Sequence, residues 1–193
     1  DLILTDPPYG MKTQNKNGQI GSRELLTPEE MRKNGLLRGR QLRVHKYPLL
    51  IGDSNQDAAR LNYEITKDLC KKQIIWGGQY FAQFLPVNGG WIFWDKQGSD
   101  NDFSDGELAY RSWGKKVYKY VHMWNGGICR QGNYKLNPKP RVHPTQKPVE
   151  LHMKILQDFS NEGDIVLDLF LGSGTSAIEA DRKSTRLNSS HGY

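Results

Sequence analysis

The sequence predicts an α/β fold, in which a doubly wound and mainly parallel sheet carries helices on both faces. Two observations predict this class. Short apolar runs that read as buried strands alternate with segments whose apolar residues recur at helical spacing. Two of the strands, one towards each end of the chain, also stop abruptly in a turn rich in proline or glycine. Open α/β sheets bind ligands beyond such strand ends, at the carboxyl edge of the sheet.

The first predicted strand opens the chain and ends in an unusual turn. Residues 2–4 are apolar, and Asp6-Pro7-Pro8-Tyr9 follows them. The prolines must end the strand, because they cannot donate a hydrogen bond to a neighbouring strand. The strand therefore delivers a carboxylate, a rigid carbonyl at Pro7 and an aromatic ring to its carboxyl end. These groups suit a flat molecule with an amino group, since the two oxygens can accept from the NH2 and the ring can stack on the face.

The middle of the chain continues the alternation of helices and strands. The elements expected there are a helix from Ser54 with apolar Ala58, Leu61, Ile65 and Leu69 against the sheet, a strand at 73–76, a short helix at 80–85 and a strand at 90–96. Asp95 and Lys96 stand at the end of the last strand, where they either line the cleft or form an ion pair. Residues 107–124, with a turn at Gly114-Lys115, are expected to form a β-hairpin.

Two polar and basic segments, residues 11–47 and 125–141, interrupt this pattern. Thr27-Pro28-Glu29-Glu30 predicts the start of a short helix in the first segment, and the rest reads as loop. Basic and aromatic side chains of this kind are used by proteins that follow a phosphate backbone. Solvated surface loops explain the same composition equally well.

The composition is that of a soluble protein with one domain. Lys and Arg number 27 against 21 Asp and Glu, and the formal net charge of +6 favours a polyanionic partner without requiring one. No apolar run approaches the roughly 20 residues of a membrane span, so no membrane partner is expected. Cys70 and Cys129 are far apart and form no CxxC pattern, so neither a disulfide framework nor a metal site is expected. A reducing cytoplasm is the expected location.

A second strand-end motif lies near the C-terminus. Residues 164–170 read as a buried strand, which is followed by a loop with Gly172 and Gly174 and by a helix that begins near Thr175. Glycines let the backbone approach a ligand closely, and the free amides at a helix start can receive a carboxylate or a phosphate. The loop therefore predicts a nucleotide-cofactor site. Taken alone, Gly172-x-Gly174-x-x-Ala177 fits the NAD fingerprint of dehydrogenases as well as an S-adenosylmethionine site.

Three motifs together resemble those of the amino-methylating DNA methyltransferases, which make N6-methyladenine or N4-methylcytosine. Asp6-Pro7-Pro8-Tyr9 is similar to their catalytic motif, and Asp168-x-Phe170-x-Gly172-x-Gly174-Thr175 is similar to their cofactor loop. Residues 143–148, which read His-Pro-Thr-Gln-Lys-Pro, resemble the segment before that loop. The catalytic motif comes first, as in the permuted arrangement called the beta group, and the resemblance runs from residue 1 to about 180. It implies the Rossmann-like sheet of the S-adenosylmethionine-dependent methyltransferases.

The resemblance also implies a role for each motif. The expected catalytic residues are Asp6, Pro7, Pro8 and Tyr9, which would receive a base that is flipped out of the DNA duplex, with the ring of Tyr9 stacked on it. The residues expected to bind S-adenosylmethionine, or to lie close to it, are Asp168, Phe170, Gly172, Gly174, Thr175, Thr145 and Lys147. For Lys147, a lysine at a helix start that faces water is the alternative.

The expected function is transfer of a methyl group from S-adenosylmethionine to the N6 nitrogen of adenine in DNA. Adenine is favoured because Asp6 opens the tetrapeptide, where the resembling N4-cytosine enzymes more often have Ser. Three alternatives stay open at this point: an N4-cytosine DNA methyltransferase, a nucleotide-dependent oxidoreductase, and a DNA-binding fragment without activity.

Residues 1–182 are expected to form a partial catalytic domain, truncated at both ends, with a short recognition insert at about 97–142. Residues 183–193 are polar and aperiodic. The resembling enzymes have a further strand there, which ends in an acid that binds the cofactor ribose. We therefore expect residues 183–193 to be a non-native or disordered tail, and the chain to bind the cofactor weakly.

Overall fold

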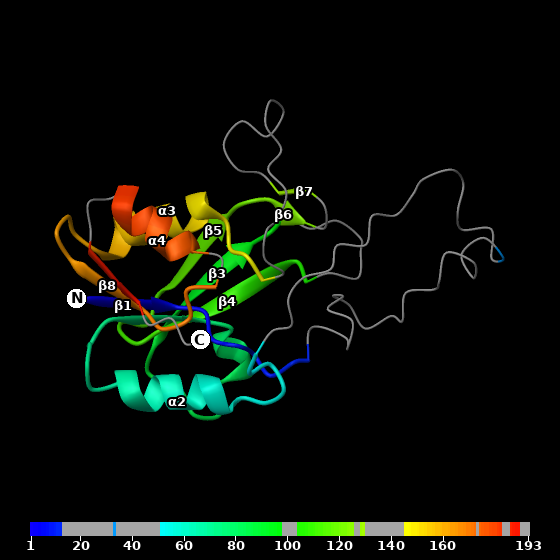
Figure 1. The fold of residues 1–193 in the computed structure, drawn as a ribbon, viewed down its shortest axis with the longest axis horizontal. Coiled ribbons are helices and arrows are strands. Elements are labelled where there is room, and N and C mark those ends of the chain that lie inside the picture. The colour runs from blue at the N-terminus through cyan, green and yellow to red at the C-terminus, as the bar shows by residue number, and fades with distance from the viewer. Residues whose placement is uncertain are drawn as a thin grey trace.

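The structure, a computed structural model, contains a seven-stranded mixed sheet with helices on both faces (Figure 1). It describes residues 1–12, 33, 51–97, 104–125, 128–129, 145–172, 174–182 and 186–189. The strand order is β5-β3-β4-β2-β1-β8-β9, and within this sheet β4 alone runs against the other strands. The predicted doubly wound, mainly parallel α/β fold is confirmed.

Helices and strands alternate in the first and last parts of the described chain, and five of the described strands follow one another in between. The strands of the main sheet are β1 (Leu2–Thr5), β2 (Gln73–Trp76), β3 (Gly90–Asp95), β4 (Gly106–Arg111), β5 (Val117–Val121), β8 (Ile165–Asp168) and β9 (Arg186–Ser189), while β6 (Trp124–Asn125) and β7 (Ile128–Cys129) form a separate pair. The helices are α2 (Asp57–Thr66), α3 (Val149–Phe159) and α4 (Thr175–Arg182), with a 3-10 turn at Gly78–Tyr80. The strands predicted at 2–4, 73–76, 90–96 and 164–170 are therefore confirmed, as is the helix predicted to start near 175.

Helices α3 and α4 cover one face of the sheet, and α2 covers the other (Figure 1). Successive residues of a strand point to opposite faces. Leu2 and Leu4 of β1 accordingly join Leu151 of α3 in the larger of the two cores. On the other face, Ile75 of β2 packs in a smaller core with Ala59 of α2. The two cores together hold the strand ends in place.

The predicted β-hairpin over residues 107–124 is wrong. β4 and β5 do not pair with each other, because β3 lies between them and pairs antiparallel with β4 and parallel with β5. Residues 112–116 therefore cross over the start of β3. Gly90 permits this crossing, since a Cβ there would lie 2.8 Å from the Lys116 carbonyl oxygen and 3.0 Å from that of Gly114.

Helix α2 forms where it is predicted but turns a different face to the sheet. Its buried residues are Ala59, Asn62 and Thr66, whereas Leu61 and Ile65 are 61% and 53% exposed. This face is suited to burial for two reasons. The side chain of Ala59 is small, and the Thr66 hydroxyl is satisfied because it donates to the Asn62 carbonyl at 2.7 Å. The predicted packing against the sheet is wrong for Leu61, Ile65 and Leu69, while Ala58 is partly buried.

The helix predicted at 80–85 is replaced by two successive turns. The 3-10 turn at Gly78–Tyr80 begins after Gly77, whose φ is +72°. In the second turn, the amides of Phe84 and Leu85 donate to the Phe81 carbonyl. The segment is therefore compact without being an α-helix.

Residues 186–189 form β9, which pairs in parallel with β8 at the edge of the sheet. The expectation of a disordered tail is therefore wrong for these four residues, while the domain boundaries and the non-native origin of residues 183–193 stay predictions. The predicted helix start at residues 27–30 and most of residues 125–141 lie outside the described residues. Within the described part of the chain, no helix combines the length and the apolar character that a membrane crossing needs.

Candidate active site

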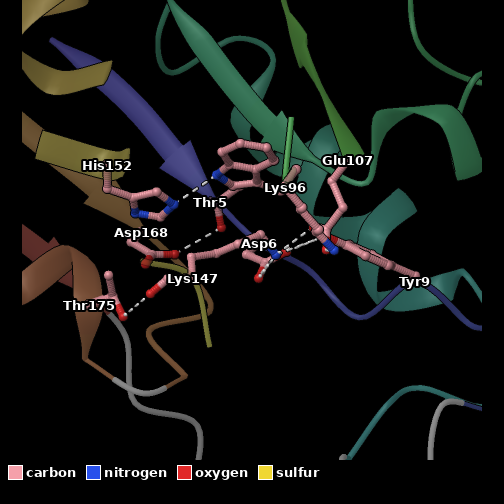
Figure 2. A network of polar contacts seen from close by, with 10 residues as sticks. Thr5, Asp6, Tyr9, Lys96, Glu107, Lys147, His152, Asp168 and Thr175 are labelled. Carbon is pink, nitrogen blue, oxygen red and sulfur yellow. Dashed lines mark hydrogen bonds and ion pairs between the residues drawn. The ribbon is translucent and has the colours of Figure 1, made fainter. Parts of the chain in front are cut away.

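The two strand-end motifs meet at the carboxyl edge of the sheet. β1 and β8 are adjacent and parallel, with Leu2 opposite Val166 and Ile3 opposite Leu167. At their ends, the Thr5 hydroxyl donates a 3.0 Å hydrogen bond to the carboxylate of Asp168, a residue 163 positions further along the chain (Figure 2). The turn with Asp6 and the glycine loop therefore leave neighbouring strand ends.

The turn after β1 is held by a carboxylate from a distant segment. Asp53 accepts hydrogen bonds from the backbone amides of Gly10 and Met11, at 3.0 and 3.2 Å. Gly10 has a φ of +72°, and a Cβ there would lie 2.6 Å from the Asn55 backbone, so the turn requires glycine. Asp53 thus closes the turn in which the predicted catalytic residues lie.

The Tyr9 ring belongs to a group of packed aromatic side chains. It stacks against Tyr80, with ring centroids 5.2 Å apart, and meets the edge of Phe81 at 6.0 Å. Gly77 makes room for it, because a Cβ there would lie 2.2 Å from the ring. Burial, reinforced by nearby carboxylates, raises the pKa of Tyr9 well above its ordinary value, so the hydroxyl keeps its proton.

Lys147 connects the parts of the site. Its side chain is 4% exposed, and its ammonium donates to the Asp6 carboxylate at 2.7 Å, to the Tyr9 hydroxyl at 3.1 Å and to Glu107 at 3.1 Å (Figure 2). The Tyr9 hydroxyl in turn donates to the other Asp6 oxygen at 2.7 Å. Burial would lower the pKa of Lys147, but the two carboxylates outweigh it, so the pKa is raised and the lysine stays charged. The alternative of a lysine that faces water is therefore wrong.

Glu107 and Lys96 continue this set of charges. Glu107 stands at the start of β4, Lys96 directly follows β3, and the two form a 2.5 Å ion pair in which both side chains are mostly buried. Burial by itself would raise the pKa of Glu107, but the cations of Lys147 and Lys96 lower it to about 2. Glu107 is therefore ionised at neutral pH. Charges of alternating sign run from Asp6 through Lys147 and Glu107 to Lys96.

Asp168 organises the glycine loop from a buried position. One of its oxygens accepts from the Thr5 hydroxyl and, at 2.9 Å, from the Phe170 amide, while the other accepts from the Ser176 hydroxyl. Burial raises the pKa of Asp168, and these hydrogen bonds act in the opposite direction. Both oxygens are thus engaged by the protein, and they tie β1 and the start of α4 to the loop.

The glycine loop has the backbone conformation that its sequence predicts. Gly172 and Gly174 have φ values of +53° and +76°, which residues with a side chain rarely adopt. A Cβ on Gly174 would meet no atom within 4 Å, so this position borders open space. Thr175 begins α4, and its hydroxyl donates to the Lys147 carbonyl at 3.3 Å. Thr145, which is half-buried, lies two residues before Lys147, so the segment before α3 is close to the loop.

A neutral histidine lies behind the charged groups. The Trp76 indole N–H donates to Nε2 of His152 at 2.9 Å, and the two rings stack with an interplanar angle of 8°. Burial, followed by the cation of Lys147, lowers the pKa of His152 to about 4. The imidazole therefore accepts from Trp76 at neutral pH.

The structure brings most of the predicted site residues to one edge of the sheet, and it adds residues that the sequence analysis missed. Asp95 and Lys96 are expected either to line the cleft or to form an ion pair; each forms an ion pair with another residue, Lys96 with Glu107 and Asp95 with Lys119. Asp53 and Glu107 are further site residues that the sequence does not predict. No sequence signal marks Glu107, because it reaches the site only through the antiparallel direction of β4. For Asp53 the one signal is the turn at Gly10, because its backbone amides require an acceptor that the turn itself does not supply.

Comparisons with known proteins find relatives of the same kind. A family model described as DNA methylase matches residues 1–187. The type II methyltransferase M.HpaI of Haemophilus parainfluenzae is 62% identical over 39 residues, which cover 20% of this chain and 12% of that protein. The type II methyltransferase M2.DpnII of Streptococcus pneumoniae is 33% identical over 85 residues, which cover 44% of this chain and 26% of that protein. The chain thus spans about a quarter or less of the length of these two relatives.

The chain also matches solved structures. The PvuII DNA methyltransferase, described as cytosine-N4-specific, has a TM-score of 0.52 and 15% sequence identity, over 98% of this chain and 73% of that chain. A complex of M1.HpyAVI with SAM has a TM-score of 0.46 and 22% identity, over 98% of this chain and 81% of that chain. At 15% identity, the likeness to the PvuII enzyme shows a shared fold.

The family model extends from the first strand of the sheet into the last, so it includes the turn with Asp6, the segment with Lys147 and the glycine loop. It covers the same motifs that carry the resemblance in the sequence. The chain therefore belongs to the DNA methylase family of N6-adenine and N4-cytosine methyltransferases.

Proposed function

We propose that this chain is the catalytic part of an enzyme that transfers a methyl group from S-adenosylmethionine to the N6 nitrogen of adenine in DNA. One observation supports this most strongly: Asp6 and the glycine loop follow adjacent parallel strands, which the Thr5–Asp168 hydrogen bond joins at their ends. A methyl donor on the loop and an amine at Asp6 would therefore be neighbours. The formal charge of +6 is favourable for a DNA partner.

The residues of the glycine loop fit S-adenosylmethionine. Gly172 and Gly174 adopt left-handed conformations, and Gly174 borders open space. Helix α4 begins directly after this loop, and the positive end of a helix suits a carboxylate. When bound, this cofactor supplies an activated methyl group on a positively charged sulfur. Phe170, Thr175 and Thr145 complete the proposed cofactor site. Asp168 supports the site by holding the loop, and Lys147 belongs to the neighbouring subsite at Asp6.

The proposed catalytic groups act on the amino group of the target base. The lone pair of an exocyclic amine is delocalised into the ring, so the nitrogen is a poor nucleophile. Hydrogen bonds from its two N–H groups to the Asp6 carboxylate and the Pro7 carbonyl draw the nitrogen towards a tetrahedral form, in which the lone pair can attack. The chain contributes by positioning and by charge that matches the transition state. Tyr9, held by its aromatic neighbours, stacks on a base that has left the duplex.

Adenine is proposed over cytosine because of the residue at position 6. An aspartate opens the tetrapeptide here, whereas the N4-cytosine enzymes that resemble this chain more often have serine. Methylation of cytosine N4 is the second candidate, since both chemistries occur in the family. The two products are different nucleosides, so one measurement separates them.

The proposal predicts that Asp6→Asn lowers methyl transfer by at least about 100-fold, because the amide carries no negative charge to match charge that develops on the amine. The measurement uses labelled S-adenosylmethionine and unmethylated genomic DNA, which is digested to nucleosides afterwards. Label in N6-methyladenine is expected, and label in N4-methylcytosine would instead support the second candidate.

Asp68→Asn is the matched control, because Asp68 is an exposed carboxylate in the turn after α2, and it should leave transfer unchanged. Full transfer by Asp6→Asn would contradict the assigned role of Asp6. Absence of label in both nucleosides with the unsubstituted protein would contradict the proposed function of this chain.

A further inference from the structure

The ammonium of Lys147 lies where the proposed mechanism places the amino group of the target base. It donates to the Asp6 carboxylate at 2.7 Å and to the Tyr9 hydroxyl at 3.1 Å (Figure 2). It also lies 5.5 Å from the centroid of the Tyr9 ring, on which the base would stack. An N–H donor that is bonded to Asp6 and close to the Tyr9 ring describes both Lys147 and the amine of a bound base.

We infer that Lys147 occupies the amine position of the target-base subsite when no base is bound, and that an entering base displaces it onto Glu107. This inference rests on the proposed function, because it assumes that Asp6 receives the base. It assigns Lys147 and Glu107 as positioning residues of the base subsite. It also replaces the earlier expectation that Lys147 binds the cofactor.

The donors of Lys147 allow this exchange without an unpaired charge. An ammonium has three N–H donors, and they are directed to Asp6, Tyr9 and Glu107. An amine that arrives with its own two N–H donors replaces only the bond to Asp6. Lys147 keeps its contacts with Glu107 and Tyr9, so the buried cation always has a carboxylate partner. Loss of every partner would be costly, because a buried and unpaired charge is strongly unfavourable.

Glu107 is suited to receive the ammonium. It is already 3.1 Å from Nζ of Lys147, and its other oxygen forms the 2.5 Å ion pair with Lys96. Lys96 thus holds the receiving carboxylate through the oxygen that Lys147 does not contact. The carboxylate is ionised at neutral pH, so it can pair with Lys147 throughout.

The backbone of Lys147 is held, so the exchange concerns the side chain alone. The Thr175 hydroxyl donates to the Lys147 carbonyl at 3.3 Å, and the next residue, Pro148, caps the start of α3. The flexible four-carbon side chain of a lysine whose backbone is fixed can move its ammonium between two nearby carboxylates. The same arrangement favours ligands with an amino group, because a base that lacks one offers Asp6 no donor in exchange for Lys147.

The test compares two nucleosides that differ in this amino group. Adenosine is titrated into the protein without any methyl donor, with binding followed by NMR, and purine riboside, which lacks the exocyclic amine, is the matched ligand. Lys147→Met should bind adenosine about tenfold more tightly than the unsubstituted chain, because the competing charged hydrogen bond is gone. Glu107→Gln should bind adenosine more weakly, because the ammonium loses its receiving charge and stays on Asp6. Purine riboside should respond to neither substitution.

Displacement predicts that the two substitutions change the affinity for adenosine in opposite directions. A merely structural role of the two residues would weaken adenosine binding in both variants. Equal or weaker binding of adenosine by Lys147→Met would overturn the inference, as would absence of binding by every variant. If Lys147→Met does not fold, the test rests on Glu107→Gln, which should bind adenosine more weakly and purine riboside unchanged. Any other result for Glu107→Gln would then overturn the inference. Lys147→Ala offers a further measurement, since added ethylammonium should fill the vacated position and compete with adenosine, whereas ethanol should not.

The outcome is independent of methyl transfer. A chain that binds nucleosides in the expected pattern but labels no DNA contradicts the proposed function and leaves the inference in place. A chain that methylates DNA while Lys147→Met binds adenosine no better contradicts the inference alone.

Discussion

At the scale of single residues, burial determines the protonation state of His152. Its Nε2 must be unprotonated to accept from Trp76, and its pKa is lowered to about 4 from 6.5. Between these two values the unfolded chain binds a proton that the folded chain does not. The stability contribution of His152 is therefore complete above pH 6.5 and is lost as the pH falls towards 4.

We predict that the free energy of unfolding falls by about 3 kcal/mol between pH 7 and pH 4 on account of His152, since one pKa unit corresponds to about 1.4 kcal/mol. His152→Gln removes the titration while its amide oxygen can still accept from Trp76. Denaturant unfolding at several pH values checks this. The variant should lose less stability over that range, and identical pH profiles for the two proteins would contradict the assignment.

Gly77 is a second residue whose role is local and testable. Its φ is +72°, and a Cβ would meet the Tyr9 ring at 2.2 Å. Gly163 is a matched control, because its φ is +86° but a Cβ there meets no atom within 4 Å. Gly163→Ala should cost about 1 kcal/mol of unfolding free energy, from backbone strain alone. Gly77→Ala should cost more and should also reduce methyl transfer, because the Tyr9 ring must move; equal costs would show that the ring contact is unimportant.

At the scale of elements, helices α2 and α3 show what sequence periodicity can and cannot predict. In α3 the apolar residues Leu151 and Ile155 recur at helical spacing, and both are fully buried. In α2 the apolar spacing was equally regular, yet Leu61 and Ile65 are exposed, because the small Ala59 and the hydrogen-bonded Thr66 form the buried face. Periodicity therefore located both helices but oriented only one.

This difference predicts opposite responses to truncation. Ile155→Ala should lower the free energy of unfolding by about 2–5 kcal/mol, since it leaves a cavity in the larger core. Leu61→Ala should change it by less than about 0.5 kcal/mol, because the side chain is 61% exposed. Chemical denaturation of both variants provides the measurement. A large loss for Leu61→Ala would mean that this face of α2 is covered in the folded protein.

At the scale of the whole molecule, the candidate site follows from the order and direction of the strands. The sequence located Asp6 and the glycine loop, because each follows a recognisable strand and both strands run parallel. It did not locate Glu107, because no local pattern shows that β4 is antiparallel and inserted between β3 and β2. The same feature of β4 explains why the predicted hairpin at 107–124 is wrong and why Glu107 was not predicted as a site residue. Pairing between strands that are distant in the chain was the information that the sequence lacked.

The bond between Thr5 and Asp168 has a consequence for how the protein is made. β1 leaves the ribosome before the strands that flank it in the sheet, and Asp168, at the end of its neighbour β8, follows 163 residues after Thr5. At typical elongation rates of about 5–20 residues per second, the second edge of β1 waits about 10–30 s for its partner. During that interval a short apolar strand has an open edge, which is an opportunity for aggregation. Slow synthesis or heavy expression should therefore lower the soluble yield, and a chaperone that covers nascent apolar segments should restore it.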